Sequence, residues 1–104
     1  MKIILLITTT NSRSNAEKIS RELVEENISP CVQILPQHSS IYKWKDKIEC
    51  AEEYMMYIKI LEKNKDIAKK IIVKLHNYEI PELLEIEGKL LSDSYSNWFK
   101  RNSK

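Results

Sequence analysis

The residues best suited to chemistry gather in one short segment, LHNYEIPEL, which spans residues 75–83. It contains His76, one of the two histidines of the chain, beside Tyr78, Glu79 and Glu82. Imidazole and carboxylate groups act as metal ligands or as general acids and bases. A histidine with a proline a few residues later is also typical of a turn that ends a helix. The segment therefore has three interpretations: a metal site, an acid–base centre, or a helix-ending turn.

His76 offers the clearest choice between a structural role and metal binding. It follows an apolar helical face that ends at Leu75, so its ring is expected to cap the last helix carbonyls. A single imidazole holds copper or zinc only when other groups complete the coordination. Those groups would come from other subunits, either equivalent histidines or a neighbour's Glu49 or Glu53. Tyr78, by contrast, is interpreted as a half-buried packing residue with a bonded hydroxyl.

Charged residues on two predicted strands are interpreted as solvated or interface ion pairs, with Lys43 or Lys47 as partners of Glu49 and Glu53, and the aromatic residues as interface contacts. Glu49 and Glu53 lie on one strand face about 13 Å apart, beyond the roughly 5–10 Å of catalytic carboxylate pairs. Lys59 stands among apolar neighbours, so we expect it to pair with Glu53 or with an acid of another subunit. Tyr42 and Trp44 share a face of the preceding strand and are interpreted as interface anchors.

The cysteines and serines form no legible nucleophile–base pair. Pairing of Cys31 with His76, or of Ser39 with His38, is neither supported nor excluded by spacing. Cys31 and Cys50 form no CxxC motif, and strand geometry separates them by roughly 33 Å, far beyond the about 7 Å that a disulfide spans. Both are expected to behave as small buried apolar residues in a reducing compartment.

Composition excludes several classes of function. A chain of 104 residues with 42% hydrophobic content is large and apolar enough for one core, which predicts a single domain over residues 1–104. Its single glycine, Gly88, excludes glycine-rich phosphate-binding loops. The net charge is only +2 and lysines alternate with glutamates, so no nucleic-acid partner is expected. The apolar run Ile3–Ile7 is too short for a secretion signal or a membrane span, which predicts a cytoplasmic protein.

Apolar periodicity predicts the elements that must position these residues. A buried strand Lys2–Thr9 precedes a helix that begins near Ser14, where Ser14 and Glu17 match a capping box, and runs to Glu26. The other expected elements are a strand over 31–44 interrupted near Pro36–Ser40, a strand over 47–60, a helix over 65–75, a strand over 82–91, and a short helix capped by Ser92 or Asp93. This βαββαβ order predicts an α+β, ferredoxin-like fold, an antiparallel sheet with both main helices on one face.

The two central strands predict a hairpin that reaches beyond the core. The segment WKDK supplies a tight turn at Lys45–Asp46, and Trp44 opposite Lys47 puts Cys50 opposite Ile41. Strands of roughly 15 residues extend about 50 Å, more than a chain of this size can cover. The apolar residues left uncovered predict self-association through the hairpin.

Four segments resemble, in order along the whole chain, the pattern of the CutA family of divalent-cation-tolerance proteins. CVQILPQHSSIYKWKDKIECAEEYMMYIK is similar to the family's hairpin, C-V-x-I-x-P-x-x-S-x-Y-x-W-x-G-K-I-x-x-x-E-E. LHNYEIPEL resembles its H-P-Y-x-x-P-E segment, and ITTTNSRSNAEKISRELVEENISPC its first strand and helix. YSNWF resembles its terminal Y-x-x-W-L.

The resemblance implies a homotrimer of ferredoxin-like subunits whose hairpins interlock around a threefold axis. It also implies a role in tolerance of divalent metals, copper above all, without an established catalytic reaction. We therefore expect a cytoplasmic binding or signalling module, not an enzyme, with copper or zinc as the candidate metal at His76. The expected ligand cleft lies between subunits and is lined by Tyr42, Trp44, Glu53, Lys59, Tyr78 and Glu79.

The chain departs from the family pattern at several positions. Some bacterial members place a cysteine near Thr8 and histidines at positions 75 and 76; of these proposed copper ligands only His76 is present. Asn77 replaces the family's proline, and Asp46 replaces its turn glycine. Two other functions stay open: a small enzyme that uses His76 as an acid–base group between subunits, and a structural trimer that anchors another protein.

Overall fold

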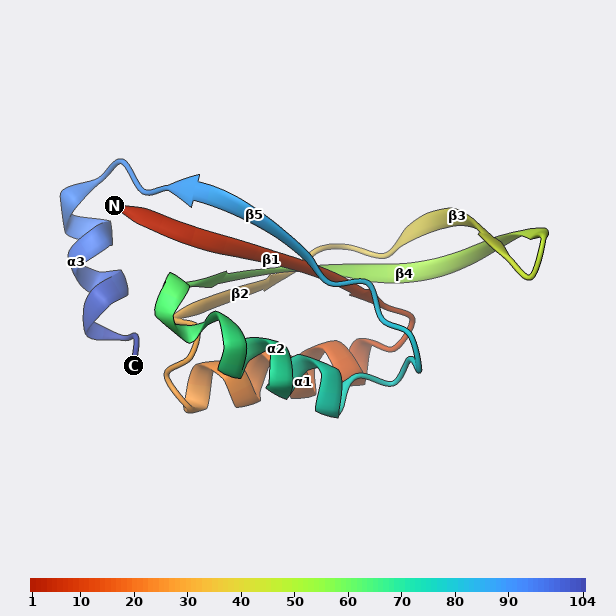
Figure 1. Cartoon of the computed structure of the whole chain (residues 1–104), viewed down its shortest axis with the longest axis horizontal. Coiled ribbons are helices and arrows are strands. Elements are labelled where there is room, and N and C mark those ends of the chain that lie inside the picture. Colours follow the sequence, from red (N-terminus) through yellow and green to blue (C-terminus); the bar gives the residue numbers. More distant parts are fainter.

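The computed structural model describes residues 1–104 as one antiparallel β-sheet with helices packed on one face (Figure 1). In chain order the elements are β1 (Lys2–Thr10), α1 (Arg13–Glu25), β2 (Cys31–Ile34), β3 (His38–Trp44), β4 (Lys47–Ile60), a 3₁₀ turn (Glu62–Asn64), α2 (Lys65–Leu75), β5 (Leu84–Lys89) and α3 (Asp93–Arg101). The predicted order of strands and helices is confirmed, and α2 has the predicted bounds.

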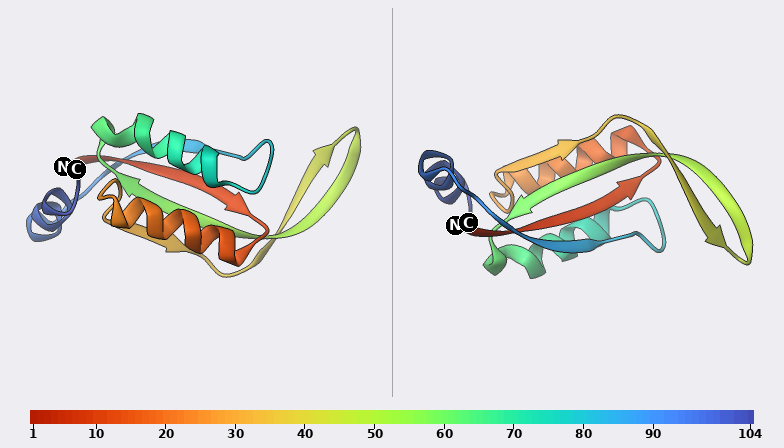
Figure 2. Two further views of the ribbon diagram at one scale, coloured as in Figure 1. Left: turned by 90° about the horizontal axis from the view of Figure 1, so that it is seen from below. Right: turned by 90° about the horizontal axis from the view of Figure 1, so that it is seen from above.

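The strands lie in the order β2-β4-β1-β5, and β3 pairs with the outer half of β4. Seen from below, α1 and α2 lie side by side across one face of this sheet, while α3 packs at the end that carries both chain termini (Figure 2). The apolar stripes of α1 and α2 meet alternate residues of β1 and β4, which buries their shared core. The ferredoxin-like arrangement is therefore confirmed. The core residues are Ile4, Leu6, Ala16, Ile19, Leu23, Ile28, Met56, Ile58, Ile60, Ala68 and Ile72.

The helix starts show where short polar residues cap the backbone. Ser12 is the N-cap of α1, and its side chain accepts the N–H of Asn15 at 3.1 Å. The prediction that Ser14 caps this helix is wrong: Ser14 lies within the first turn and its hydroxyl is 3.0 Å from that of Ser12. Ser12 is the cap because it is the last residue with extended backbone before α1. Its side-chain oxygen therefore faces the free backbone N–H groups of the first helical turn. In α3 the cap is Ser92, one of the two predicted residues.

The β3–β4 hairpin has the predicted register, with Trp44 opposite Lys47. Its two turn residues, Lys45 and Asp46, both adopt positive φ, at 50° and 65°. Positive φ at both central positions defines a type I′ turn, whose twist matches that of the flanking strands. The tight turn predicted from the sequence is confirmed, although neither residue is the glycine that such turns prefer.

A bulge separates β2 from β3. Ile34 pairs with Met56 and His38 pairs with Glu53, so residues 35–37 face only residues 54–55. The interruption predicted near Pro36 is thus confirmed as one extra residue on this strand. Bulges bend and twist the strand that carries them, and from this point the hairpin swings away from the sheet (Figure 2).

The outer hairpin is largely uncovered in the single chain. The molecule measures 46 Å along its longest axis against 24 and 22 Å across it, and Ile41 and Ile48 on this arm are 75% and 78% exposed. The expectation that both cysteines are buried is wrong: Cys50 is exposed because it lies on this arm, and Cys31 is half-buried. None of the helices is long and apolar enough to cross a membrane.

Candidate functional site

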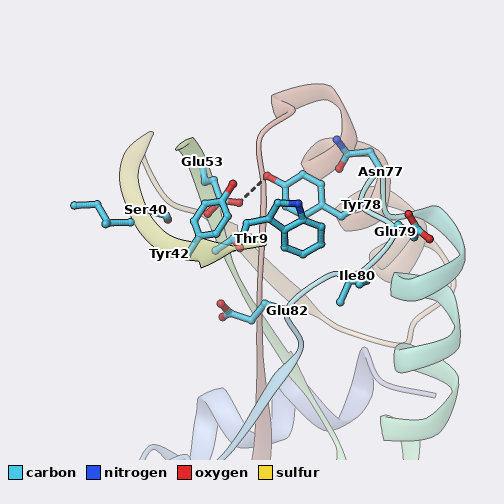
Figure 3. Close-up of a pocket in the computed structure, with 11 residues that line it drawn as sticks. Thr9, Ser40, Tyr42, Glu53, Asn77, Tyr78, Glu79, Ile80 and Glu82 are labelled. Carbon is cyan, nitrogen blue, oxygen red and sulfur yellow. Dashed lines mark hydrogen bonds between the residues drawn. The ribbon is translucent and has the colours of Figure 1, made fainter. Parts of the chain in front are cut away.

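A cleft of about 720 Å³ opens between the hairpin and the loop that joins α2 to β5 (Figure 3). It forms because β1 ends opposite Tyr54, so β3 and the outer part of β4 pass beyond the end of β1 while the loop stands across from them. Its volume lies within the roughly 300–1,000 Å³ typical of small-molecule sites. The lining residues are Thr9, Ser40, Ile41, Tyr42, Trp44, Glu53, Asn77, Tyr78, Glu79, Ile80 and Glu82.

Glu53 is buried at the base of the hairpin, with 7% of its surface exposed, and is held by Tyr78. The Tyr78 hydroxyl donates to Glu53 Oε2 at 2.6 Å, a short charge-assisted bond that Figure 3 marks. Burial of the phenol, together with this bond to a carboxylate, raises the pKa of Tyr78 above its usual value of 10.0. The hydroxyl therefore stays protonated and acts as a donor. The prediction of a half-buried tyrosine with a bonded hydroxyl is confirmed.

His76 lies behind Tyr78 with both ring nitrogens hydrogen-bonded. Nδ1 accepts the backbone N–H of Tyr78 at 3.0 Å, and Nε2 is 3.0 Å from the carbonyl oxygen of Thr9. A carbonyl only accepts, so Nε2 carries the proton and the ring is neutral. Burial lowers the pKa of His76 below its usual 6.5, although the Thr9 carbonyl and the Glu53 charge act in the opposite direction.

This geometry corrects one prediction and constrains another. The end of α2 is capped by the backbone N–H of His76, which donates to the Ile72 carbonyl at 2.9 Å. The ring contacts β1 instead, so the prediction that the imidazole caps the helix carbonyls is wrong. A metal ion at His76 would have to replace one of the two ring hydrogen bonds. The metal role of His76 stays a prediction.

A network of amide and hydroxyl groups fastens the loop to β1 and α1. The side chain of Asn77 accepts from Thr10 Oγ1 at 2.6 Å and donates to Asn11 Oδ1 at 2.8 Å, and its backbone N–H donates to Asn15 Oδ1 at 3.3 Å. Asn15 Nδ2 in turn donates to the Leu75 carbonyl at 2.9 Å. A proline at position 77 has no backbone N–H and no side-chain amide, so it would make none of the three bonds of Asn77. Asn77 therefore anchors the loop through three hydrogen bonds that the family's proline could not make.

Of the six residues predicted to line a ligand cleft, five line this one: Tyr42, Trp44, Glu53, Tyr78 and Glu79. Lys59 does not, because its Nζ donates to Cys31 Sγ at 3.8 Å and lies 6.0 Å from the ring of Tyr95. Six residues along a strand separate Lys59 from Glu53 by about 20 Å. The predicted pairing of these two residues within one chain is therefore wrong.

Several lining residues were not assigned to the cleft from the sequence. Thr9, Ser40 and Ile41 come from strands whose approach to the loop is set by tertiary structure. Asn77 and Glu82 lie in the candidate segment, and the signal that pointed to them was their nearness to His76 in the chain. The short polar run at the end of β1, TTTN, was the only sign of the anchoring network.

The donor groups of one chain do not fit a copper or zinc ion. No three histidine, cysteine, aspartate or glutamate side chains converge in residues 1–104, whereas zinc sites use three or four protein ligands. Cys31 faces Lys59 in the sheet and Cys50 lies out on the hairpin opposite Ile41, so the two thiols are far from each other and from His76. A metal centre would need ligands from other chains.

Comparison with known proteins decides the family. Residues 4–102 match the family described as CutA1 divalent ion tolerance protein. The chain belongs to this family. The resemblance seen in the hairpin and in the loop segment is thereby confirmed. The relatives of the chain include proteins named for divalent-cation tolerance.

Relatives from distant organisms agree with this assignment. The divalent-cation tolerance protein CutA of Thermococcus kodakarensis is 32% identical over 102 residues, which cover 97% of this chain and 96% of that protein. The chloroplastic CutA protein of Arabidopsis thaliana is 26% identical over 97% of this chain but only 56% of its own length. The chain thus spans about half the length of the plant, mouse and human CutA proteins that it matches. The crystal structure of CutA1 from Shewanella sp. SIB1 superposes with a TM-score of 0.92 at 31% identity, covering 97% of this chain and 94% of that one.

Proposed function

We propose that this CutA chain acts as a homotrimer, a binding or signalling module in the cytoplasmic response to divalent metal ions. The observation that carries the proposal is the cleft, where the buried carboxylate of Glu53 meets aromatic residues of a projecting hairpin. The Tyr78 hydroxyl is bonded to Glu53, and the His76 ring behind it is bonded to the carbonyl of Thr9. Groups held in this way suit binding better than proton transfer. The two free cysteines are in keeping with a reducing compartment.

Uncovered apolar surface supports the trimer. Besides the hairpin, the sheet face opposite α1 and α2 carries no helix (Figure 1). Leu84 and Ile86 of β5 pair with Ile7 and Leu5 of β1 on this face, and both β5 residues are exposed. Contiguous apolar surface of this kind marks protein–protein interfaces, and most homo-oligomers close with rotational symmetry. A cleft at the base of the hairpin then borders the interface, where a neighbour can complete it.

We propose that copper or zinc binds to the assembled protein. His76 serves as a ligand there only if other chains supply the remaining donor groups. A single chain supplies His76 alone, and its ring must give up the bond to Thr9 or to Tyr78 to bind metal. Imidazole suits both metals. Three equivalent histidines, or one histidine and a neighbour's carboxylate, would supply the remaining ligands.

Calorimetric titration with copper and zinc, together with light scattering, tests the proposal. We expect a trimer mass at micromolar concentration, binding heat with at least one metal, and a higher melting temperature in its presence. The variant His76→Gln should lose the metal response. His38→Gln changes the second histidine of the chain, which lies in β3 and does not line the cleft, and should keep the response. Absence of both heat and thermal shift in the unmodified protein would remove direct metal binding, and a monomer mass would remove the trimer.

A further inference from the structure

Glu53 is a buried carboxylate that has no cation within its own chain. Its Oε2 accepts from Tyr78, but Oε1 accepts no hydrogen bond. The four ion pairs of the chain involve other residues, namely Lys2, Arg13, Glu17, Lys65, Glu62, Glu85 and Glu87. Every polar side-chain atom that is fully buried in this chain has a hydrogen-bond partner. Because Glu53 Oε1 has none, it is not fully buried, and Glu53 is one of the residues that line the cleft. Buried charges in proteins are normally paired, and this one faces an open space instead.

The rest of the cleft is suited to positive charge. Its lining holds three glutamates, Glu53, Glu79 and Glu82, and neither a lysine nor an arginine, in a chain whose net charge is +2. Tyr78 lies beside the Glu53 carboxylate in Figure 3, and Tyr42 and Trp44 also line the cleft. Aromatic faces attract organic cations through their quadrupoles, most strongly where water is excluded. The surroundings therefore repel anions and favour a cation with an apolar stem.

We propose that the cleft binds a primary ammonium group, with Glu53 Oε1 as its acceptor and Tyr42 and Trp44 as aromatic walls for its stem. The inference rests on the proposed function, since it names the ligand class of the same cleft. A bare metal ion fits less well, because no three donor side chains converge and aromatic carbon is no ligand for copper or zinc. An ammonium needs only one carboxylate and can take cation–π contacts for the rest of its shell.

The ammonium can come from two sources with the same chemistry. One is a free amine of the size of the cleft. The other is a lysine of a second copy, because the hairpin of each chain carries Lys43, Lys45 and Lys47, all exposed. Either source would neutralise Glu53, and the two differ in whether the oligomeric state depends on that carboxylate.

Fluorescence of Trp44 gives a direct readout of the cleft. The chain has two tryptophans, and Trp98→Phe in α3 leaves Trp44 as the only one. Titration with n-butylammonium, against neutral 1-butanol of the same shape, should change this fluorescence saturably in the millimolar range for the amine alone. Glu53→Gln keeps an oxygen for Tyr78 but removes the charge, and should weaken amine binding at least tenfold. Glu25→Gln, an exposed change on α1 of equal charge, is the matched control and should leave binding unchanged.

Light scattering of the same variants separates the two sources. Saturable amine binding that Glu53→Gln abolishes, with an unchanged mass, assigns the site to a free amine. A silent amine titration combined with a lower mass for Glu53→Gln, and for one of Lys43→Gln, Lys45→Gln or Lys47→Gln, assigns it to a lysine of a second copy. Equal responses to amine and alcohol, or no effect of Glu53→Gln on either measurement, would overturn the proposal. None of these readouts uses metal, so the metal titration can fail independently.

Discussion

Tyr78 links the two sides of the cleft through its own backbone and side chain. Its N–H donates to His76 Nδ1, which belongs to the same loop, and its hydroxyl donates to Glu53 on the hairpin. The rings of His76 and Tyr78 pack with centroids 5.0 Å apart, which keeps the phenol directed at the carboxylate. One residue thus fixes the tautomer of the histidine and the position of the buried acid.

Tyr78→Phe should destabilise the protein by about 1.5–3 kcal/mol, the range for a hydrogen bond to a charged group. The reason is that Glu53 stays buried but loses its only hydrogen-bond donor. Urea unfolding followed by circular dichroism measures the change. Glu53→Gln, which keeps an acceptor oxygen for the hydroxyl, should cost less. A double variant as stable as Tyr78→Phe alone fits this account, whereas strictly additive losses would show that the two residues do not interact.

His76 should make stability fall in mildly acidic solution. Because burial lowers its pKa below 6.5 in the folded protein, the unfolded chain takes up the proton first as the pH drops. The contribution is fully present above pH 6.5 and is lost as the pH falls from 6.5 through the lowered pKa of the folded protein. Melting temperatures between pH 8 and pH 5 measure it. The decline should persist in His38→Gln and flatten in His76→Gln; an equal decline in both variants would assign the titration to other groups.

At the scale of elements, the hairpin turn is the segment under most backbone strain. Lys45 and Asp46 hold left-handed conformations that cost an L-residue roughly 1–2 kcal/mol each. They do so because the strand pairing of β3 with β4 continues to Trp44 and Lys47, which leaves only two residues to reverse the chain. The hydrogen-bonded pairing of β3 with β4 therefore offsets the cost of two turn residues that are not glycine.

Asp46→Gly should relieve part of this strain and stabilise the hairpin tip by about 1 kcal/mol, since glycine adopts positive φ without a steric penalty. The tip projects from the core, so amide hydrogen exchange of Trp44 and Lys47, the hydrogen-bonded pair that flanks the turn, is the suitable measurement. Exchange should slow about fivefold. Asp46→Ala keeps the strain and serves as the control. Faster exchange in the glycine variant would mean that the Asp46 side chain stabilises the turn by another route.

The sequence predicted the elements well and the site only in part, for a physical reason. Periodicity and turn chemistry act over a few residues, so α2, the hairpin register and the bulge near Pro36 were all accessible from the chain. The hydrogen-bond partner of Glu53 could not be predicted in this way. Tyr78 reaches it from 25 residues away, and the choice between Tyr78 and Lys59 depends on how far β4 extends past β1.

The anchoring network escaped prediction for a related reason. Thr10, Asn11 and Asn15 follow a strand and open a helix, where short polar residues usually cap backbone groups. Here they also bond Asn77 across 62 to 67 residues of chain. In a single sequence, a short polar residue that caps a helix looks the same as one that makes a long-range bond. For the same reason the sequence predicted Ser14 as the cap of α1, whereas the structure has Ser12.

At the scale of the whole molecule, one chain leaves too much apolar surface in water. The core lies between the sheet and two helices, while the opposite sheet face and the outer hairpin have no covering element (Figure 1). Burying an isoleucine that is three-quarters exposed contributes on the order of 1.5–3 kcal/mol, and Ile41 and Ile48 both qualify. The hairpin therefore has more to gain from a second copy than from any contact within the chain.

Ile48→Glu should weaken assembly without harming the isolated chain. Ile48 pairs with Lys43 across the hairpin, so a glutamate there gains an opposite charge in the monomer but must be desolvated in an apolar interface. We expect the mass from light scattering to fall towards that of the monomer at micromolar concentration, with the β-sheet circular dichroism signal retained. Val73→Glu, at an exposed position on α2, is the control and should leave the mass unchanged. A variant at position 48 that keeps the mass of the unmodified protein would show that the hairpin tip lies outside the interface, and would move the contact to the open face of the sheet.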